Sequence, residues 1–220
     1  MSDGGARSRL AQLDSCAVSD AGDALGLRTW VSGLRCVAGQ PRVVGRCVTV
    51  EVGRPSEAVA SKHLCTSAVE SAGPGDVIVV AHQGRLDCAA WGGNLSRAAR
   101  HRGVEGTIVH GAVRDVDESD LIGYTLFATA STPVTARGRA QEHSWGHPVD
   151  VDGLSVATGD WVLADRSGVV FVARERLGEL LERAEAIAQK EATIASSIDG
   201  GAPVGSVMGT NYETMLEETP

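Results

Sequence analysis

The stretch from Gly75 to Val113, GDVIVVAHQGRLDCAAWGGNLSRAARHRGVEGTIVHGAV, decides the fold because two short apolar runs flank a segment of helical character. Each run has the length of a strand and is bounded by turn residues, a pattern typical of strands buried on both faces. Residues 88–102 between them form a predicted helix that stops at Gly103. This β, α, β order with short links predicts two parallel strands joined by a right-handed crossover.

The segments before this unit predict one more strand and two helices. Residues 44–52 alternate between apolar and mostly polar side chains, which indicates a half-buried strand. A helix is expected from Ser56 and ends before Gly73. Residues 6–26 predict a polar start followed by a short helix, with Ser19 and Asp20 available as caps.

The segments after the unit predict a hairpin and a long helix. Residues 158–173, TGDWVLADRSGVVFVA, favour an antiparallel hairpin that turns between Asp165 and Gly168. Leucine, isoleucine and alanine recur at helical spacing over residues 174–198. The tail from about residue 200 to 220 is polar and is expected to be mobile or to lie at a subunit interface.

Composition bounds the class of protein. With 220 residues, of which 43% are hydrophobic, the chain can bury one sizeable core, so we expect a single domain over residues 1–220. A net charge of -8 leaves no basic stripe for a phosphate backbone, which argues against direct nucleic-acid binding. Five scattered cysteines form no C-x-x-C pair and suit a reducing cytoplasm. No apolar stretch reaches the length of a membrane span, so we expect a soluble cytoplasmic protein.

Arg114 and Asp115 follow the second apolar run directly, at the edge where open α/β sheets place their ligands. Alone, such a pair is usually a local salt bridge worth under about 1 kcal/mol. Gly92 and Gly93 precede the predicted helix and would let backbone N–H groups approach an anion. Neither a P-loop nor a dinucleotide fingerprint occurs, so a carboxylate is as suitable a guest as a phosphate. An anion could therefore lie between these amides and Arg114 while Asp115 holds a divalent cation.

Several longer stretches carry a family resemblance. The segments AAWGGNLSRAARHRGVEGTIVHGAVRDVDE, TPVTARGR and PVDVDGLSVATGDWVLADRSGVVFV occur in the order and spacing of the RraA-like family, which the chain resembles over most of its length. This family includes aldolases for 4-hydroxy-4-methyl-2-oxoglutarate and 4-carboxy-4-hydroxy-2-oxoadipate, and the regulator of ribonuclease activity A. The most specific part is the G-x-V-R-D-x-D core at residues 111–117.

The resemblance implies a fold and an assembly. The fold is an α/β/α sandwich of the swivelling phosphohistidine-domain type with a mixed sheet. The chains assemble as homotrimers or dimers of trimers, with active sites at subunit interfaces.

The resemblance also implies residue roles. Arg114 would bind the carboxylate of a pyruvoyl group, and Asp115 would ligate Mg²⁺ or Mn²⁺, with water filling most of the coordination sphere. The oxoacid would be cradled by the segment consisting of Gly92, Gly93, Asn94 and Leu95. Glu191 is the best match for a glutamate that reaches the metal-bound waters from a neighbouring subunit.

The activity implied is that of a divalent-metal-dependent class II pyruvate aldolase, or an oxaloacetate-type decarboxylase, acting on a 2-oxoacid through a metal-stabilised pyruvate enolate. Two alternatives stay open: a non-catalytic protein-binding regulator of ribonuclease activity, and a diverged biosynthetic enzyme that reuses the site. Gly93 departs from the acidic residue that many aldolases of the family carry there. Ala81 and His82 are another departure, because the family commonly has an aspartate after that strand.

Overall fold

The computed structural model describes residues 2–56 and 62–209, and its centre is the predicted β, α, β unit. Strands β4 (Asp76–Ala81) and β6 (Gly106–Val113) pair in parallel, with Val77 opposite Gly106, and helix α4 (Gly93–His101) lies between them in sequence. The predicted helix begins too early, because residues 89–91 form a short strand, β5 (Ala89–Trp91), parallel to β6. All three residues of β5 are buried, so this stretch is apolar throughout. Such a short apolar run is compatible with either a strand or a helix.

The sheet is mixed, with a parallel centre and antiparallel edges. Its strand order is β1-β12-β11-β3-β4-β6-β7-β2, with β5 paired to β6 and β8 paired to β3. The pairs β3–β4, β4–β6 and β6–β7 are parallel. The remaining strands of this sheet are β1 (Trp30–Val31), β2 (Arg35–Ala38), β3 (Val43–Gly53), β7 (Leu126–Ser131), β8 (Gln141–Trp145), β11 (Trp161–Ala164) and β12 (Val169–Val172).

Strand β3 corrects the prediction of a half-buried strand. Most of its residues are buried, and they contribute to more than one core cluster. Val48 and Val50 belong to the core beneath α3 (Thr66–Ser71) and α4, whereas Val43 and Cys47 belong to the core on the opposite face. β3 lies inside the sheet, paired with β4, β11 and β8, and is not an edge strand. Other elements therefore pack against both of its faces.

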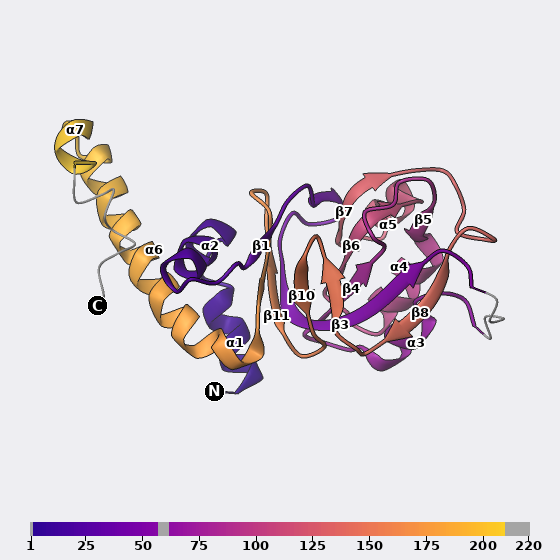
Figure 1. Ribbon diagram of the computed structural model, residues 1–220. Helices are drawn as coiled ribbons and strands as arrows, with labels where there is room; N and C mark the ends of the chain where they lie inside the picture. The colour runs from indigo at the N-terminus through magenta and orange to yellow at the C-terminus, as the bar shows by residue number, and fades with distance from the viewer. Residues whose placement is uncertain (1, 57–61, 210–220) are drawn as a thin grey trace.

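Helices lie on two sides of the sheet, as Figure 1 shows. On one side are α3 (Thr66–Ser71), α4 and α5 (Val116–Leu121), and on the other are α1 (Asp3–Leu10), α2 (Ser15–Ala24) and α6 (Leu177–Asp199). A separate hairpin of β9 (Val149–Val151) and β10 (Leu154–Val156) covers residues of β4 and β6 on the face away from α4. The predicted fold class, an α/β sandwich around a mixed sheet, is confirmed.

The N-terminal prediction was wrong in its caps. Two helices are present, and Ser19 and Asp20 lie inside α2 instead of capping it. The cap is Asp14, whose carboxylate accepts the Ala17 N–H at 2.8 Å. The helix expected from Ser56 is described only from Thr66, and residues 57–61 of that prediction lie outside the described residues.

The C-terminal predictions were closer. β11 and β12 form the expected hairpin, closed by a hydrogen bond from Asp165 N–H to Gly168 O at 3.0 Å. A 3₁₀ turn, η1 (Arg174–Arg176), precedes α6, which buries the leucine stripe and then extends from the body toward α7 (Val204–Val207) (Figure 1). None of the described helices is both long and apolar enough to cross a bilayer. Residues 210–220 of the predicted tail lie outside the described residues.

Candidate functional site

A cavity of about 410 Å³ opens where the N-terminus of α4 meets the end of β6. Its walls come from residues 63–66, the β5 strand, the start of α4, the end of β6 and residues 135–137. The predicted site residues of the two sequence stretches all line it: Gly92, Gly93, Asn94, Leu95, Arg114 and Asp115. The β, α, β geometry therefore brings together the glycine pair and the Arg-Asp pair, which lie more than twenty residues apart in the chain.

Asp115 is the link between the two stretches. Its backbone is left-handed, with φ of 55°, a conformation that aspartate tolerates better than most residues. One carboxylate oxygen, Oδ2, accepts the Gly93 N–H at 3.1 Å, and the other, Oδ1, accepts Nε of Arg114 at 3.2 Å. The carboxylate thus caps the positive end of α4 while about a third of the side chain stays exposed.

This arrangement reduces the number of backbone N–H groups that the predicted site can offer to an anion. The Gly93 amide is occupied by the protein's own carboxylate, so it is not free for a substrate as the sequence suggested. Asn94 and Leu95 lie in the first turn of α4, where N–H groups have no acceptor within the helix. Of the predicted site residues, these two amides and the guanidinium of Arg114 are the donors left for a carboxylate.

The two glycines lie close to side chains at the end of β6 and on α5. A Cβ at Gly92 would lie 2.9 Å from Oδ2 of Asp115 and 3.1 Å from Cγ of Arg114. A Cβ at Gly93 would collide with the carboxylate of Glu118, which also forms an ion pair with Arg97 at 2.6 Å. The space that an acidic side chain at position 93 would need is therefore already occupied by the carboxylate of Glu118.

Three buried polar side chains form a chain of hydrogen bonds next to the cavity. Nε1 of Trp91 donates to Oγ of Ser96 at 3.0 Å, and the hydroxyls of Ser96 and Ser119 lie 2.8 Å apart. All three side chains are almost fully buried. They join β5, α4 and α5, and Trp91 also forms part of the cavity wall.

Four polar residues of the cavity were given no role by the sequence: His63, Thr66, Thr135 and Arg137. Residues 132–139 belong to a segment that carries the family resemblance, but no periodicity indicates that they reach the glycine pair. The contact depends on a hydrogen bond from Ala89 N–H to Val134 O at 3.0 Å, which fastens this loop to β5. A second arginine in a segment of the resemblance was the one signal available from sequence.

The donor set near Asp115 fits a divalent ion held mainly by water. Among the described residues, no group of three or more His, Cys, Asp or Glu side chains could hold a metal ion. Magnesium and similar ions are commonly bound through one or two carboxylates, with waters and substrate oxygens completing the octahedron. The partly exposed carboxylate of Asp115 can supply one such ligand.

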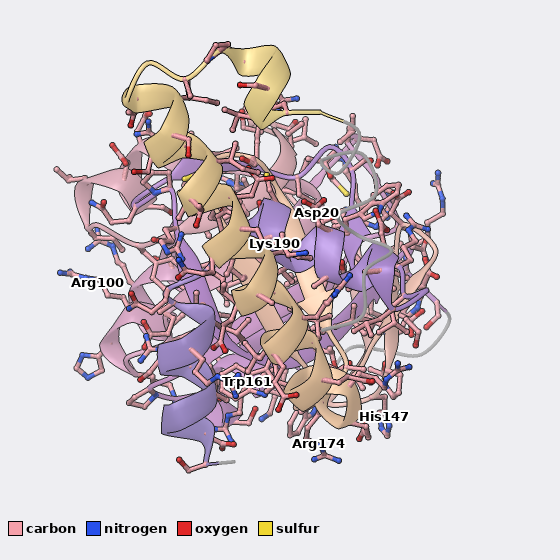
Figure 2. All side chains as sticks on the ribbon, turned by 90° about the vertical axis from the view of Figure 1, so that its left-hand side faces the viewer. Asp20, Arg100, His147, Trp161, Arg174 and Lys190 are labelled. Carbon is pink, nitrogen blue, oxygen red and sulfur yellow. The ribbon has the colours of Figure 1, made fainter. Side chains whose placement is uncertain are left out.

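Glu191 does not lie at this cavity within one chain. It belongs to α6, on the other side of the sheet, where its charge helps to raise the pKa of Asp20, after the larger effect of burial. Figure 2 labels Asp20 of α2 and Lys190, which precedes Glu191 in α6, on the side of the molecule that carries these two helices. A role for Glu191 at the metal therefore stays a prediction that requires a second subunit.

The two histidines nearest the sheet edge lie outside the cavity. His82 is fully buried, and its ring nitrogens lie 3.2 Å from Cys88 O and 3.4 Å from Val52 O. Burial lowers the pKa of the ring, so His82 is a neutral part of the protein interior. His110 faces a different cavity of about 390 Å³, together with three carboxylate residues, Glu51, Asp150 and Asp152.

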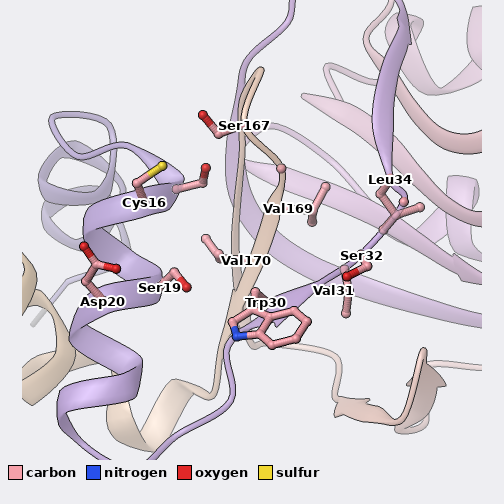
Figure 3. Close-up of a pocket in the computed structure, with 13 residues that line it drawn as sticks. Cys16, Ser19, Asp20, Trp30, Val31, Ser32, Leu34, Ser167, Val169 and Val170 are labelled. Carbon is pink, nitrogen blue, oxygen red and sulfur yellow. The ribbon is translucent and has the colours of Figure 1, made fainter.

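Charge distinguishes the candidate cavity from others of similar size. Figure 3 shows a cavity of about 410 Å³ between α2 and strands β1 and β12, where Cys16, Asp20 and Trp30 gather. Among the described residues, Asp20 is the one charged residue of its lining, and the lining beside His110 carries carboxylates without a lysine or arginine. Both would repel an anionic substrate. The cavity at Arg114 has two arginines and one aspartate in its lining and is the best suited to a carboxylate.

The part of the chain that matches a known protein family includes the residues of the cavity. The profile of the RraA-like family, described as Aldolase/RraA, matches residues 15–171, which include all residues of the cavity. Protein DlpA of Legionella pneumophila is 27% identical over 193 residues, 88% of this chain and 31% of that protein. A Burkholderia mallei protein named as a 4-hydroxy-4-methyl-2-oxoglutarate aldolase is 40% identical over 107 residues, 49% of this chain and 64% of that protein. The chain thus spans less than two thirds of either relative.

Solved structures agree with this match. A crystal structure of an uncharacterized protein from Pseudomonas syringae has a TM-score of 0.84 at 28% identity, covering 94% of this chain and 98% of that one. Streptomyces coelicolor RraAS2, described as an unusual member of the RNase ES inhibitor RraA family, has a TM-score of 0.79 at 26% identity, covering 87% and 96%. The RNA-processing inhibitor RraA from Thermus thermophilis has a TM-score of 0.58 at 30% identity, covering 70% and 91%.

Proposed function

This chain belongs to the RraA-like family, and we propose that it is a carbon–carbon lyase that cleaves a 2-oxoacid with the help of Mg²⁺ or Mn²⁺. The observation that carries this proposal is the meeting of Arg114, Asp115 and the first turn of α4 at one cavity. The name of the Burkholderia relative supports an aldol substrate resembling 4-hydroxy-4-methyl-2-oxoglutarate.

Substrate binding follows from the donors described above. The guanidinium of Arg114 binds the carboxylate next to the keto group, with two parallel hydrogen bonds that a lysine could not reproduce. The Asn94 and Leu95 amides approach the same oxoacid end from the start of α4. The apolar side chains of Leu64, Leu95 and Ala136 line the same cavity and limit the access of water.

The bond cleavage needs a base, an electron acceptor and no covalent intermediate. A base takes the proton of the substrate hydroxyl, the carbon–carbon bond breaks, and its electron pair passes to the oxoacid fragment, which is then protonated and released as pyruvate. A divalent ion, when bound, would act as a Lewis acid for the charge that develops on the oxoacid's carbonyl oxygen. Asp115 would hold this ion. A Schiff base is not required, and neither Lys62 nor Lys190, the chain's two lysines, lines the cavity.

The test combines turnover with a partial reaction. With Mn²⁺, the protein should release pyruvate from 4-hydroxy-4-methyl-2-oxoglutarate and exchange the methyl protons of pyruvate in heavy water, and EDTA should abolish both. Arg114→Ala should lose both as well. Full turnover by Asp115→Ala would remove the metal role, and a wild-type protein inactive in both assays would overturn the proposal. Oxaloacetate decarboxylation measured in parallel decides between aldolase and decarboxylase.

A second candidate function is protein-binding regulation of a ribonuclease. It is favoured by the likeness to the RNA-processing inhibitor from Thermus, which is 30% identical over most of its own length. Thermal shift separates the two candidates. Joint stabilisation by Mn²⁺ and oxalate, a mimic of the pyruvate enolate, supports the enzyme, whereas indifference to the pair supports the regulator. A diverged biosynthetic lyase would bind the pair yet leave both test substrates uncleaved.

We also propose that the working unit is a homotrimer or a dimer of trimers. The role predicted for Glu191 requires an assembly of more than one chain, because only another subunit could bring that residue to Asp115. Light scattering coupled to gel filtration measures the assembly. Glu191→Gln should reduce turnover in the assembled protein, and unchanged turnover would remove Glu191 from the site.

A further inference from the structure

Arg137 is a second guanidinium in the lining of the same cavity. It also lines a smaller neighbouring cavity of about 110 Å³, together with Lys62, His63 and Glu142. Arg114 is engaged by the carboxylate of Asp115 at 3.2 Å. Among residues 2–56 and 62–209, by contrast, no carboxylate forms an ion pair with Arg137.

The loop that carries Arg137 is fixed in place while the side chain is left exposed. The Arg137 N–H donates to Oγ1 of Thr135 at 3.3 Å, and Ala136 is buried beneath the loop. Ala136 O accepts the N–H groups of Arg139 at 2.8 Å and Ala140 at 2.9 Å. The backbone position of Arg137 at the cavity is therefore well determined, although its charge is not used by the fold.

The lack of an ion-pair partner for Arg137 among the described residues is not explained by a shortage of acidic side chains. The chain has 28 acidic residues against 20 lysines and arginines, and nearly all the arginine ion pairs of the described residues lie elsewhere on the surface. A cavity of about 410 Å³ falls within the range of ligand sites, about 300–1,000 Å³, and is roomy for a molecule as small as pyruvate. Space and charge both remain after a single carboxylate has been bound at Arg114.

We propose that Arg137 binds the second carboxylate of a dicarboxylic 2-oxoacid and so selects dicarboxylates over monocarboxylates at this site. The inference rests on the proposed function, because Arg114 must take the carboxylate next to the keto group. Arg137 is then a specificity-determining residue, and its contribution lies mainly in KM, since the distal carboxylate keeps its charge throughout aldol cleavage.

The experiment compares two substrates that differ at one group. The wild type, Arg137→Ala and Arg139→Ala are assayed with Mn²⁺ on 4-hydroxy-4-methyl-2-oxoglutarate and on the analogue in which a methyl group replaces its distal carboxylate. Arg139→Ala removes a positive charge from the same loop, at a residue outside the cavity lining. A charge-assisted hydrogen bond predicts that Arg137→Ala lowers the preference for the dicarboxylate about 10- to 100-fold, mostly through KM. Arg139→Ala should keep the wild-type preference.

The outcomes separate this inference from the proposed function. Loss of the preference in Arg137→Ala alone supports the inference, and partial recovery in Arg137→Lys supports a charge effect. Equal losses on both substrates, or no loss, would overturn it while the lyase activity stands. If the wild type cleaves neither substrate and exchanges no pyruvate protons, the proposed function itself fails. A binding readout, the Mn²⁺-dependent thermal shift with each intact substrate, should show the same change in preference.

Discussion

The carboxylate of Asp115 accepts a hydrogen bond from the backbone N–H of Gly93 at 3.1 Å, and this bond ties the end of β6 to the start of α4. The site is therefore assembled before any ligand arrives. The same carboxylate that we assign to a divalent ion also stabilises the helix whose amides face the substrate, so structural and chemical effects must be separated by the choice of variant.

Asp115→Asn should separate these two effects. Asparagine tolerates left-handed backbone and keeps an oxygen acceptor for the Gly93 N–H, so the free energy of unfolding should stay within about 0.5 kcal/mol of the wild type. Asp115→Ala loses the acceptor and adds backbone strain, which should cost about 1–2 kcal/mol. Urea denaturation measures both values. Turnover with Mn²⁺ should be lost in both variants, and an active Asp115→Asn protein would contradict the role as metal ligand.

A comparison of three glycines tests the geometry of the site. Gly92→Ala places a methyl group against Asp115 and Arg114, and should lower kcat/KM at least about tenfold, because displacement of reacting groups by less than 1 Å is costly. Gly93→Ala meets the flexible end of Glu118, which can move aside at the expense of its pair with Arg97, an exposed pair worth under about 1 kcal/mol. Gly178→Ala on α6 has open space and serves as the control. Equal effects at positions 92 and 93 would contradict this reading of the site.

Arg114→Lys tests the geometry of carboxylate recognition. Lysine keeps the charge but cannot form two parallel hydrogen bonds, so kcat/KM for the oxoacid should fall about 10- to 100-fold. Steady-state kinetics with the dicarboxylate measures the loss. Arg100→Lys, on the exposed part of α4 and outside the cavity, is the matched control and should behave as the wild type. Retention of full efficiency by Arg114→Lys would show that charge alone suffices.

His82 predicts how stability depends on pH. Burial lowers the pKa of its ring in the folded protein, so the unfolded chain binds the proton more readily. Stability attributable to the neutral ring is present above the unfolded pKa, about 6.5. It declines as the pH falls below that value and continues to decline until the lower folded pKa is reached. Chemical denaturation between pH 7 and pH 5 should show this decline, and His82→Gln should flatten it; the same slope in both proteins would exclude His82 as its origin.

Much of this architecture could be predicted from local patterns. The apolar runs at β4 and β6 are continuous, the leucine stripe of α6 has clear helical spacing, and the β11–β12 turn has polar residues and glycine. One error arose where a short apolar run suits two structures. Ala89–Trp91 is compatible with a helix, and its strand depends on pairing with β6, a contact that local sequence does not show.

The candidate site was predictable to a similar degree. Arg114, Asp115 and the glycine segment lie within one β, α, β unit, so the topology of that unit suffices to bring them together. Arg137 reaches the cavity through the attachment of residues 132–136 to β5, a tertiary contact. The position of the Glu118 carboxylate next to Gly93 depends on how closely α5 packs against α4. The order of elements along the chain does not determine that packing.

The buried hydroxyls of Ser96 and Ser119 bind α4 to α5, and the indole of Trp91 binds both to β5. If either helix moved away alone, the hydrogen bond between Ser96 and Ser119 would be lost, at a cost of about 0.5–1.5 kcal/mol. The two helices should therefore open as one cooperative unit, and their backbone amides should exchange with solvent deuterium at similar, slow rates. The loop that carries Arg137 is outside this unit. A lineage could thus alter the choice of substrate through that loop and leave the reactive half of the cavity unchanged.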